Sequence, residues 1–536
     1  MGAGLVSRRI APWLVVGALL VAACSSGSGA DDAEGDGAPV ATEAEASGAD
    51  PNGVLRASYD LALESAGGET RVDPMVATGD TQNNDALWYL VHGRLLRPTL
   101  DGGVEPELAT SVDVVDPNTI VVQVREGMKF SDGSPLDAAA VKASFDTVLG
   151  ARATNQTGYN AEFFALKTAE VTGPSEVTLS FTDGLAPSWL DQYGAGFATS
   201  IVKPGDTTGS GAVSGPFRIV RREKGKLWVL EKNPNYWDAD DIKFAGIELV
   251  HTDYGTAQSG LAALEAGQVD ITFTTPSLVS TLGGSIEAVS RTSPNESVML
   301  HICKAEGALA DARVRRAINK AIDREALNEA IYGGTAEPMT QSWPAGHRLN
   351  NPDVEGDLGY DLEGARQLMQ EAGYGDGVKI DIYPVDINNL PDVAVVMKQQ
   401  LAEVGIDLTI IPSPNYVAQF LEPGTPAIGL YPSFVSGPQK LTAWSGETLG
   451  NVCDYSDPEL DALISQVRQV SESSDEAVEL WHEISAIVTR DALSGFIVFT
   501  SVLAAYDTDR IGDMTPFPYG GNLLPDPKVS FIKADG

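Results

Sequence analysis

Residues 215–237 read GPFRIVRREKGKLWVLEKNPNYW. Gly215-Pro216 interrupts the chain, and two runs rich in strand-forming residues follow. Asn233-Pro234-Asn235 ends the second run with residues that favour turns. The stretch therefore predicts a pair of strands that ends at an aromatic corner, Tyr236-Trp237.

The next residues extend this unit. Residues 242–250 read IKFAGIELV and predict a strand. Thr256 is placed to cap a helix that Gly267 ends, and residues 269–271 predict the strand that leaves it. The whole stretch is thus α/β in character and carries no catalytic group of its own.

Length and charge narrow the possible functions. A chain of 536 residues with 43% hydrophobic residues exceeds one ordinary core, so we expect two or three domains. It has 36 basic and 74 acidic side chains, for a net charge of −38. Such a surface repels phosphate backbones, which argues against a nucleic-acid partner.

The N-terminus predicts export. Arg8 and Arg9 precede an uncharged run, Ile10 to Ala23, that is too short to span a bilayer but suits a signal peptide, which we place at residues 1–23. The run ends in Val21-Ala22-Ala23-Cys24, which resembles the lipobox of bacterial lipoproteins. The resemblance implies cleavage before Cys24 and a diacylglycerol on its thiol; the alternative is an ordinary secretory signal followed by a chance cysteine.

Residues 24–53 follow as a predicted flexible, acidic linker. Its part from Ser25 to Asn52 contains no aromatic and no basic residue, so it cannot bury a core. As a flexible coil it would span about 30 Å end to end. A folded body on such a tether stays close to a membrane partner.

Two further cysteines, Cys303 and Cys453, lie in the exported part of the chain. In an oxidising compartment they can pair, and two separate buried thiols are an equal alternative. Their spacing fits no metal motif.

The second half of the chain predicts a β-α-β unit. Residues 378–383 read as a strand, 391–404 as a helix ended by Gly405, and 406–411 as a strand. Earlier segments predict a strand at 54–61, a helix at 85–96, strands at 119–124 and 177–181, and a helix at 137–149. Later segments predict helices at 361–372, 458–470 and 476–491, a strand at 496–499, and a helix capped by Asp311 and ended by Gly333-Gly334.

Several short motifs, in this order, resemble the solute-binding proteins of the peptide/nickel family of ABC importers. The similarity covers essentially the whole mature chain. The motifs are Glu105-Pro106-Glu107-Leu108-Ala109, Arg125-Glu126-Gly127 with Phe130-Ser131-Asp132-Gly133, Gly215-Pro216-Phe217, Asn233 to Trp237, Leu264 to Asp270, Asp311 to Ile318, Ala321 to Arg324, Ala365-Arg366 and Glu371 to Tyr374.

The resemblance implies an α/β fold of the periplasmic-binding-protein type: two lobes joined by a hinge, with an extra subdomain inserted in the first lobe. Carried onto this chain, lobe 1 comprises residues 54–96, 208–293 and 499–536. The inserted subdomain takes 97–207, and lobe 2 takes 294–498. Trp237 and Asp270 then serve the fold of the first lobe rather than the ligand.

A search for catalytic chemistry finds no complete motif. The chain has no Gly-x-Ser-x-Gly, and His482-Glu483 lacks the second histidine of a zinc helix. Asp238, Asp240 and Asp241 lack the spacing of a calcium loop, so a solvated acidic turn is expected there. We therefore expect neither an enzyme nor a metal site nor a cofactor.

The resemblance directs attention to loops of the second lobe at 383–388 and 431–444. These loops lack the acid and the arginine that peptide binders of the family use for free peptide ends, which favours a neutral or cationic ligand with a flat apolar surface. Aromatic side chains could stack on it, or could instead be core residues under loops. The expected ligand-binding residues are Glu64, Trp343, Tyr383, Asp386, Asn388, Tyr431, Phe434 and Trp444.

The function implied is that of a lipid-anchored, extracytoplasmic receptor. It captures a small solute, peptide-like or otherwise neutral or cationic, and delivers it as a monomer to a membrane complex of ABC permease and ATPase. Two alternatives stay open at this point: a surface sensor or chaperone on the same fold, and a hydrolase with an unrecognised acid/base pair.

Overall fold

The computed structural model describes most of the chain. The described residues are 48–59, 87–99, 103–153, 165–196, 199–206, 211–252, 257–302, 307–386, 389–412, 428–433, 437–441, 443–444, 451, 455–517 and 523–534.

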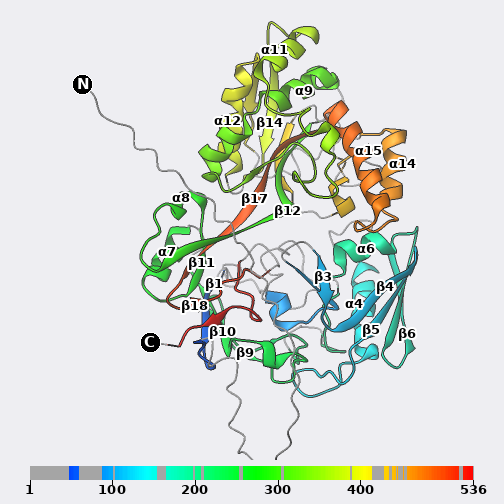
Figure 1. Cartoon of the computed structure of the whole chain (residues 1–536), viewed down its shortest axis with the longest axis vertical. Coiled ribbons are helices and arrows are strands. Elements are labelled where there is room, and N and C mark those ends of the chain that lie inside the picture. The colour runs from blue at the N-terminus through cyan, green and yellow to red at the C-terminus, as the bar shows by residue number, and fades with distance from the viewer. Residues whose placement is uncertain are drawn as a thin grey trace, which may run out of the picture.

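A large mixed sheet runs through the described part of both lobes. Its path is β15-β14-β16-β12-β17-β11-β1-β10-β9-β8, with β13 paired to β17 beside this path. Figure 1 shows the strands at one end of this path in the upper lobe and those at the other end in the lower lobe. The bounds are β1 Val54–Tyr59, β8 Phe217–Glu223, β9 Leu227–Lys232, β10 Gly246–His251, β11 Ile271–Phe273, β12 Ile286–Ile302, β13 Glu337–Pro338, β14 Val378–Pro384, β15 Ile406–Ile410, β16 Ile428–Ser433 and β17 Ser494–Asp507.

The first lobe is built around the stretch at 215–270. β8 and β9 form the predicted antiparallel pair, and Asn233 ends it by accepting from the backbone N–H of Asn235 at 3.0 Å. β1 pairs in parallel with β10 and contacts β11, which follows α7 (Ala257–Glu265). The short α8 (Pro276–Val279) and the strands β18 (Ile511–Gly512) and β19 (Phe531–Ile532) complete this lobe.

Buried charge holds the first lobe together. Asp270 is fully buried and accepts from the backbone N–H of Arg56 at 2.8 Å, and it pairs with the guanidinium groups of Arg56 and Arg510. Trp237 lies between the cations of Arg125 and Lys528, at 3.8 and 4.9 Å from the ring centroid. Both residues therefore have structural partners, as expected from the sequence.

The inserted subdomain has its own sheet and core. The sheet has the order β4-β5-β7-β6 and packs against α4, and β2 pairs with β3 beside it. A single cluster of buried side chains, from Leu95 to Ile201, fills this unit. The bounds are β2 Leu96–Pro98, β3 Val104–Pro106, β4 Ala109–Asp116, β5 Thr119–Val124, β6 Leu166–Gly173, β7 Glu176–Phe181, α4 Ala138–Ala153 and α6 Ala186–Tyr193.

The second lobe contains the predicted β-α-β unit. β14 and β15 are parallel, α12 connects them, and Gly405 leaves the helix with a positive φ of 83°, where glycine is favoured. The apolar sides of α9, α11 and α12 pack on one core cluster, and those of α14 and α15 on a second. The bounds are α9 Ala312–Ala321, α10 Arg324–Leu327, η4 Asn328–Tyr332, α11 Leu362–Glu371, α12 Leu390–Ala402, α14 Pro458–Val467 and α15 Asp475–Asp491, with short 3₁₀ turns η2 Ala239–Asp241, η3 Gly307–Ala310, η5 Pro352–Val354 and η6 Gly437–Leu441.

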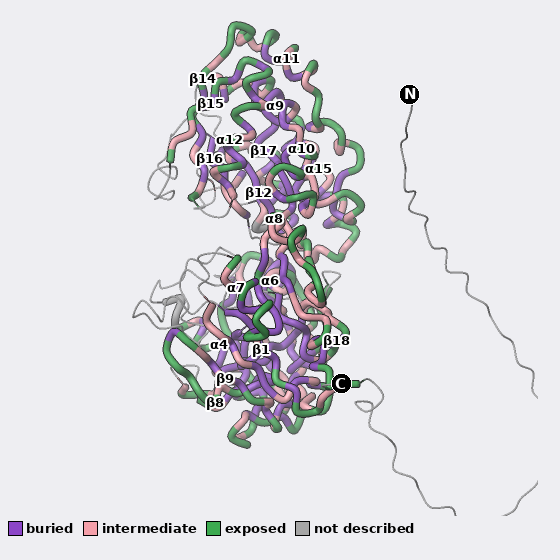
Figure 2. Tube along the Cα trace, turned by 90° about the vertical axis from the view of Figure 1, so that its left-hand side faces the viewer, coloured by how far each residue is buried: buried purple, intermediate pink, exposed green. Residues whose placement is uncertain are grey.

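Two long strands, β12 and β17, join the lobes. They pair antiparallel from Ile286 opposite Asp507 to His301 opposite Ser494, and the register shifts between Thr292 and Ser297. Figure 2 shows the narrow waist of the molecule between the two bodies. A pair of strands with an irregular register at a waist is the expected place for a hinge.

Several sequence predictions were wrong in their extent, among them the strand predicted at 496–499, which runs from Ser494 to Asp507. The helix predicted at 85–96 ends at residue 91, because Gly93 packs tightly on Leu108 and Ser214 and the chain then enters β2. The helix predicted from Asp311 to Gly333 is broken after Ala321, where Asp323 caps a new turn through the backbone N–H of Ala326. The predicted strand at 242–250 begins only at Gly246.

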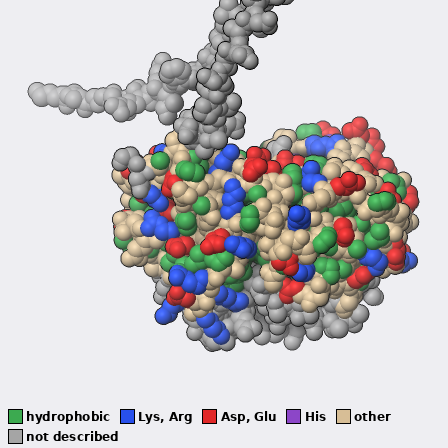
Figure 3. All heavy atoms as spheres, turned by 90° about the horizontal axis from the view of Figure 1, so that it is seen from below, with side chains coloured by type: hydrophobic (Ala, Val, Ile, Leu, Met, Phe, Trp, Pro, Cys, Tyr) green, Lys and Arg blue, Asp and Glu red, His purple; other side chains and the backbone are tan. Residues whose placement is uncertain are grey.

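Two further features of the fold bear on membranes and on surface charge. No helix in the described ranges is both long and apolar enough to cross a membrane. On the face of Figure 3, acidic and basic side chains are interspersed, so the acidic excess forms no single patch on that face.

Candidate functional site

The candidate site lies at one edge of the sheet of the second lobe. β14 and β16 run parallel, with Tyr383 opposite Gly429 and Pro384 opposite Leu430, so their carboxyl ends meet at the same edge. β12 runs antiparallel to β16 and places Ser297 opposite Ser433 there. Since β12 continues from this edge into the first lobe, the edge faces the hinge.

Local sequence explains this arrangement. β14 alternates buried and more exposed side chains, and Gly405 returns the chain from α12 into β15 so that the strands run parallel. In open α/β sheets, ligands bind in the crevice outside the carboxyl ends of the strands. The edge formed by 383–386 and 431–433 is therefore the candidate solute site.

Three of the residues expected from the sequence lie at this edge. Tyr383 is partly buried at the end of β14, and Asp386 is exposed just beyond it. Tyr431 is on β16, and its ring lies 3.9 Å from that of His301, centroid to centroid, at an interplanar angle of 43°. The structure thus brings together a carboxylate and two phenol rings from separate segments.

Burial shifts the pKa values of His301 and Tyr431, whose rings are in contact. It lowers the pKa of His301 to about 3 and raises the pKa of Tyr431 above its usual range. At neutral pH both side chains are therefore uncharged. His301 lies opposite Gly429, farther from the edge than Tyr431, which also packs against the core of the second lobe.

Trp343 and Trp444 lie in the core of the second lobe. Each is 3% exposed. The indole N–H of Trp444 donates to Ser494 Oγ at 3.0 Å, and Trp343 stacks on His347 at 4.4 Å and meets Trp481 edge-on at 5.3 Å. In this conformation both rings are occupied by core contacts.

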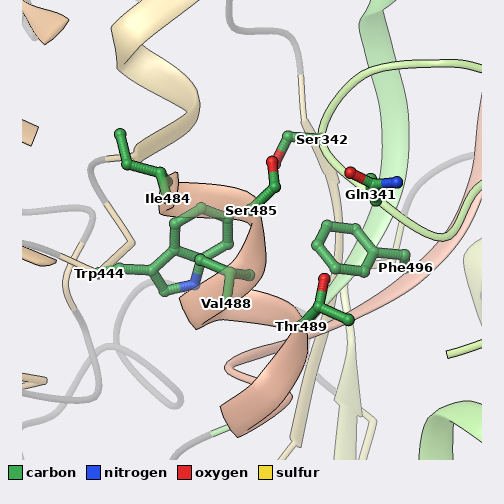
Figure 4. Close-up of a pocket in the computed structure, with 8 residues that line it drawn as sticks. All are labelled: Gln341, Ser342, Trp444, Ile484, Ser485, Val488, Thr489 and Phe496. Atoms are coloured by element: carbon green, nitrogen blue, oxygen red, sulfur yellow. The ribbon is translucent and has the colours of Figure 1, made fainter. Parts of the chain in front are cut away.

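The gap beside Trp444 is drawn in Figure 4. The indole, Val488 and Phe496 converge on it, and Thr489 from α15 closes one side. The space does not admit a water-sized sphere. It is therefore a packing gap in the lobe and not a place for a solute.

The remaining expected residues lie outside the described residues. These are the ligand candidates Glu64, Asn388 and Phe434, the lipidation candidate Cys24, and the possible disulfide partners Cys303 and Cys453.

Sequence reasoning missed a cation beside the hinge. Lys440 donates from Nζ to the carbonyl of Pro294 on β12 and lies 4.8 Å from the ring centroid of Trp343. Burial lowers its pKa to about 7, partly offset by Glu472. Lys440 is inside the segment 431–444 that the sequence singled out, but only the aromatic residues of that segment were considered.

An ion pair lies at the hinge itself. Arg291 and Glu296, both on β12, are 3.2 Å apart across the irregular part of the strand. Burial raises the pKa of Glu296. The pair bridges the residues at which the register of β12 shifts, so it stabilises the local bend.

Metal binding has no support among the described residues. No group of three or more His, Cys, Asp or Glu side chains within the described ranges is arranged to hold a metal ion. Asp238, considered above for calcium, instead pairs with Lys528.

Comparisons with known proteins agree with this geometry. The family model of the bacterial extracellular solute-binding proteins, family 5 Middle, matches residues 103–431. The glutathione-binding protein GsiB of Salmonella paratyphi A (strain ATCC 9150 / SARB42) is 25% identical over 395 residues, 66% of this chain and 69% of GsiB.

Two solved structures share the fold. The ABC transporter substrate-binding protein CtaP of Listeria monocytogenes has a TM-score of 0.77 at 19% identity, over 90% of this chain and 100% of CtaP. The periplasmic binding protein DppA of Helicobacter pylori, in complex with the peptide STSA, has a TM-score of 0.68 at 18% identity, over 90% of this chain and 98% of DppA.

The α/β fold in two lobes, the hinge strands and the family match lead to one conclusion. The chain belongs to family 5 of the bacterial extracellular solute-binding proteins and is an extracytoplasmic solute-binding protein of the ABC-importer type, not an enzyme.

Proposed function

We propose that this chain is a lipid-anchored receptor that encloses a small solute between its lobes and delivers it to an ABC permease. The observation that carries the proposal is the meeting of residues 383–386 and 431–433 at one sheet edge that faces the hinge strands. A solute at this edge contacts both lobes only when they close, so its binding shifts the population toward the closed form.

The proposed solute is peptide-like or another small organic molecule that is neutral or cationic. Tyr383 and Tyr431 provide aromatic surface, and the exposed carboxylate of Asp386 is suited to an ammonium or amide group. The names of two relatives support the class, because GsiB is a glutathione-binding protein and DppA was solved with a tetrapeptide.

The proposed division of the chain follows the expected boundaries. Lobe 1 is 54–96, 208–293 and 499–536, the inserted subdomain is 97–207, and lobe 2 is 294–498. Separate clusters of buried side chains support it, since the buried members of the cluster in the inserted subdomain lie between 95 and 201, and all but Leu95 fall within 97–207.

The proposed anchor is the diacylated Cys24, with residues 25–52 as tether to a monomeric folded body. The support is the lipobox-like sequence at its position after the apolar run. A permanent bilayer anchor takes more than one acyl chain, which a diacylglycerol provides.

The test of the proposed function combines identification of the ligand with a measurement of molecular shape. Native mass spectrometry of the purified chain identifies a co-purified solute, and reduced glutathione with a set of di- and tripeptides serves as the starting panel. Small-angle scattering during titration with any binder should show compaction. Binding without compaction for every binder would overturn the proposed closure.

A matched pair of variants tests the site. Asp386→Asn should weaken a cationic binder about tenfold, the scale of one charge-assisted contact. Asp381→Asn changes an exposed aspartate on β14, the strand that precedes Asp386, away from the edge, and should leave the affinity unchanged. Equal effects of the two variants would remove Asp386 from the site.

A further inference from the structure

The two lobes touch at a second place besides the hinge. In Figure 1, α6 of the inserted subdomain faces α14 and α15 on the right, whereas β12 and β17 join the lobes on the left. A contact on that side connects the lobes at a place away from the hinge strands.

The contact is made by hydrogen bonds from the second lobe to one carboxylate. Asp191, near the end of α6, accepts from the backbone N–H of Glu472 at 2.7 Å and from Ser471 Oγ at 3.2 Å. Donors and acceptor are 280 and 281 residues apart in the chain and belong to different bodies.

The donating loop is already ordered by its own bonds. Ser474 Oγ donates to the carbonyl of Ser471 at 2.7 Å, and it also caps α15 by accepting from the N–H of Ala477 at 3.1 Å. Arg348 donates to the carbonyl of Glu472. The two donors therefore present a preformed site to Asp191, which lowers the entropy cost of forming the contact.

The bonds themselves are exposed, and close packing lies beside them. A Cβ added to Gly437 would lie 2.1 Å from Glu472 Oε1 and 3.5 Å from Gln192 Cγ, so this glycine is pressed between the two bodies. A Cβ on Gly184 would likewise lie 3.1 Å from Gln469 Cγ. Both glycines have positive φ, which gives a second reason for glycine at each position.

Glu472 is itself an acid beside Asp191. Burial, with the charge of Asp191, raises the pKa of Glu472 to about 8, and the charge of Lys440 opposes this shift. Burial also raises the pKa of Asp191, to about 6. The shift of Glu472 favours its uncharged form, which reduces its repulsion toward Asp191.

We propose that Asp191 is a positioning residue for solute capture: its bonds to Ser471 and Glu472 form a latch that stabilises the closed lobes from the side opposite the hinge. The latch rests on the hinge closure proposed above. It touches no solute and acts by lowering the free energy of the closed form relative to the open one, which slows the release of any bound solute.

Hydrogen exchange of the mature chain from Ser25 onward tests the latch in the closed form, with a binder from the panel above at saturation. That chain retains every helix and strand of the described residues. The Glu472 amide should exchange about tenfold faster in Asp191→Ala than in the wild type, since a hydrogen bond to an ionised acceptor is lost. Asp191→Asn keeps one acceptor oxygen, so its Glu472 amide should exchange at a rate between those of the wild type and Asp191→Ala.

The matched control is Asp113→Ala, which removes an exposed aspartate of the same subdomain that bonds only within its own strand, to Ser111. It should leave the exchange of Glu472 unchanged. Ser471→Ala removes the hydrogen bond that the second lobe donates from Ser471 Oγ. It replaces Asp191→Ala in the exchange measurement if Asp191→Ala does not fold.

Scattering of the same binder-saturated samples adds a measure of shape. The radius of gyration should rise in Asp191→Ala and not in Asp113→Ala. Fast exchange of Glu472 in the wild type, or equal exchange and equal radius in all variants, would overturn the latch. If the latch fails while a binder still compacts the protein, the proposed function stands; a failure to compact would contradict that function instead.

Discussion

Replacing Asp270 should destabilise the first lobe without altering the site. The fully buried carboxylate accepts from the Arg56 backbone N–H at 2.8 Å and pairs with the guanidinium groups of Arg56 and Arg510. Its own backbone connects to β1, since its N–H donates to the carbonyl of Arg56 at 2.7 Å, and to β17, since its carbonyl accepts from Asp507 at 3.0 Å. One side chain therefore ties β1, β11 and the C-terminal segment together.

The expected loss of stability follows from the interactions that each partner of Asp270 loses. In Asp270→Ala the N–H of Arg56 loses its acceptor, which costs about 1–3 kcal/mol for a buried donor. The two arginine side chains are 30% and 29% exposed and can return to water, so the lost ion pairs add less than a fully buried pair would. We expect the free energy of unfolding of the first lobe to fall by about 3 kcal/mol in total.

Equilibrium urea denaturation measures this change, and hydrogen exchange of peptides from β1 and β14 assigns each transition to a lobe, because the lobes can unfold separately. Asp270→Asn keeps an acceptor for Arg56 and should lose about half as much. Asp240→Ala, an exposed aspartate of the same lobe, is the control. A loss below about 0.5 kcal/mol in Asp270→Ala, the range of ordinary surface substitutions, would refute the reasoning.

Three further changes have defined outcomes. Burial raises the pKa of Glu107 from 4.5 to about 7 although Tyr236 donates to it, so the folded state holds a proton that the unfolded chain releases, and stability should fall by about 3 kcal/mol as pH rises through this window. Glu107→Gln should reduce the fall by this amount in denaturation curves from pH 4.5 to 7, and a slope equal to that of the wild type would assign the fall to other groups, such as Glu472. Gly215→Ala should lower the thermal midpoint of the first lobe, because its Cβ would lie 2.7 Å from the carbonyl carbon of Val91; an unchanged midpoint would mean that this backbone yields easily. Trp444→Phe removes the donor to Ser494 and should cost the second lobe about 2 kcal/mol in urea denaturation, while a loss of solute affinity at unchanged stability would return Trp444 to the site.

Much of the fold could be predicted because its signals are local. The pair β8 and β9, the turn at Asn233, the cap at Asp311 and the helix predicted at 361–372 each depend on neighbouring residues in the chain. The same is true of the β-α-β unit, in which Gly405 follows the helix and leads into β15. Periodicity and capping encode such elements directly.

The candidate site was predictable only as two separate loops. Their positions in the chain followed from the resemblance, but the register of β14, β16 and β12 decides that 383–386 and 431–433 share an edge. Sequence alone also had no means to distinguish a buried aromatic from an exposed one, and the burial of Trp343 and Trp444 comes from packing against α15 and its neighbours.

Gly215 illustrates the difference between what the sequence determines and what the tertiary structure decides. Its sequence determines a break before a strand, because Gly-Pro favours neither helix nor strand interior. Only the tertiary structure decides why the residue must be glycine: it donates to the carbonyl of Val91 at 3.0 Å and leaves no room for a side chain. The contact of Asp191 with Glu472 is likewise tertiary, because two positions 281 residues apart meet only once both bodies have folded.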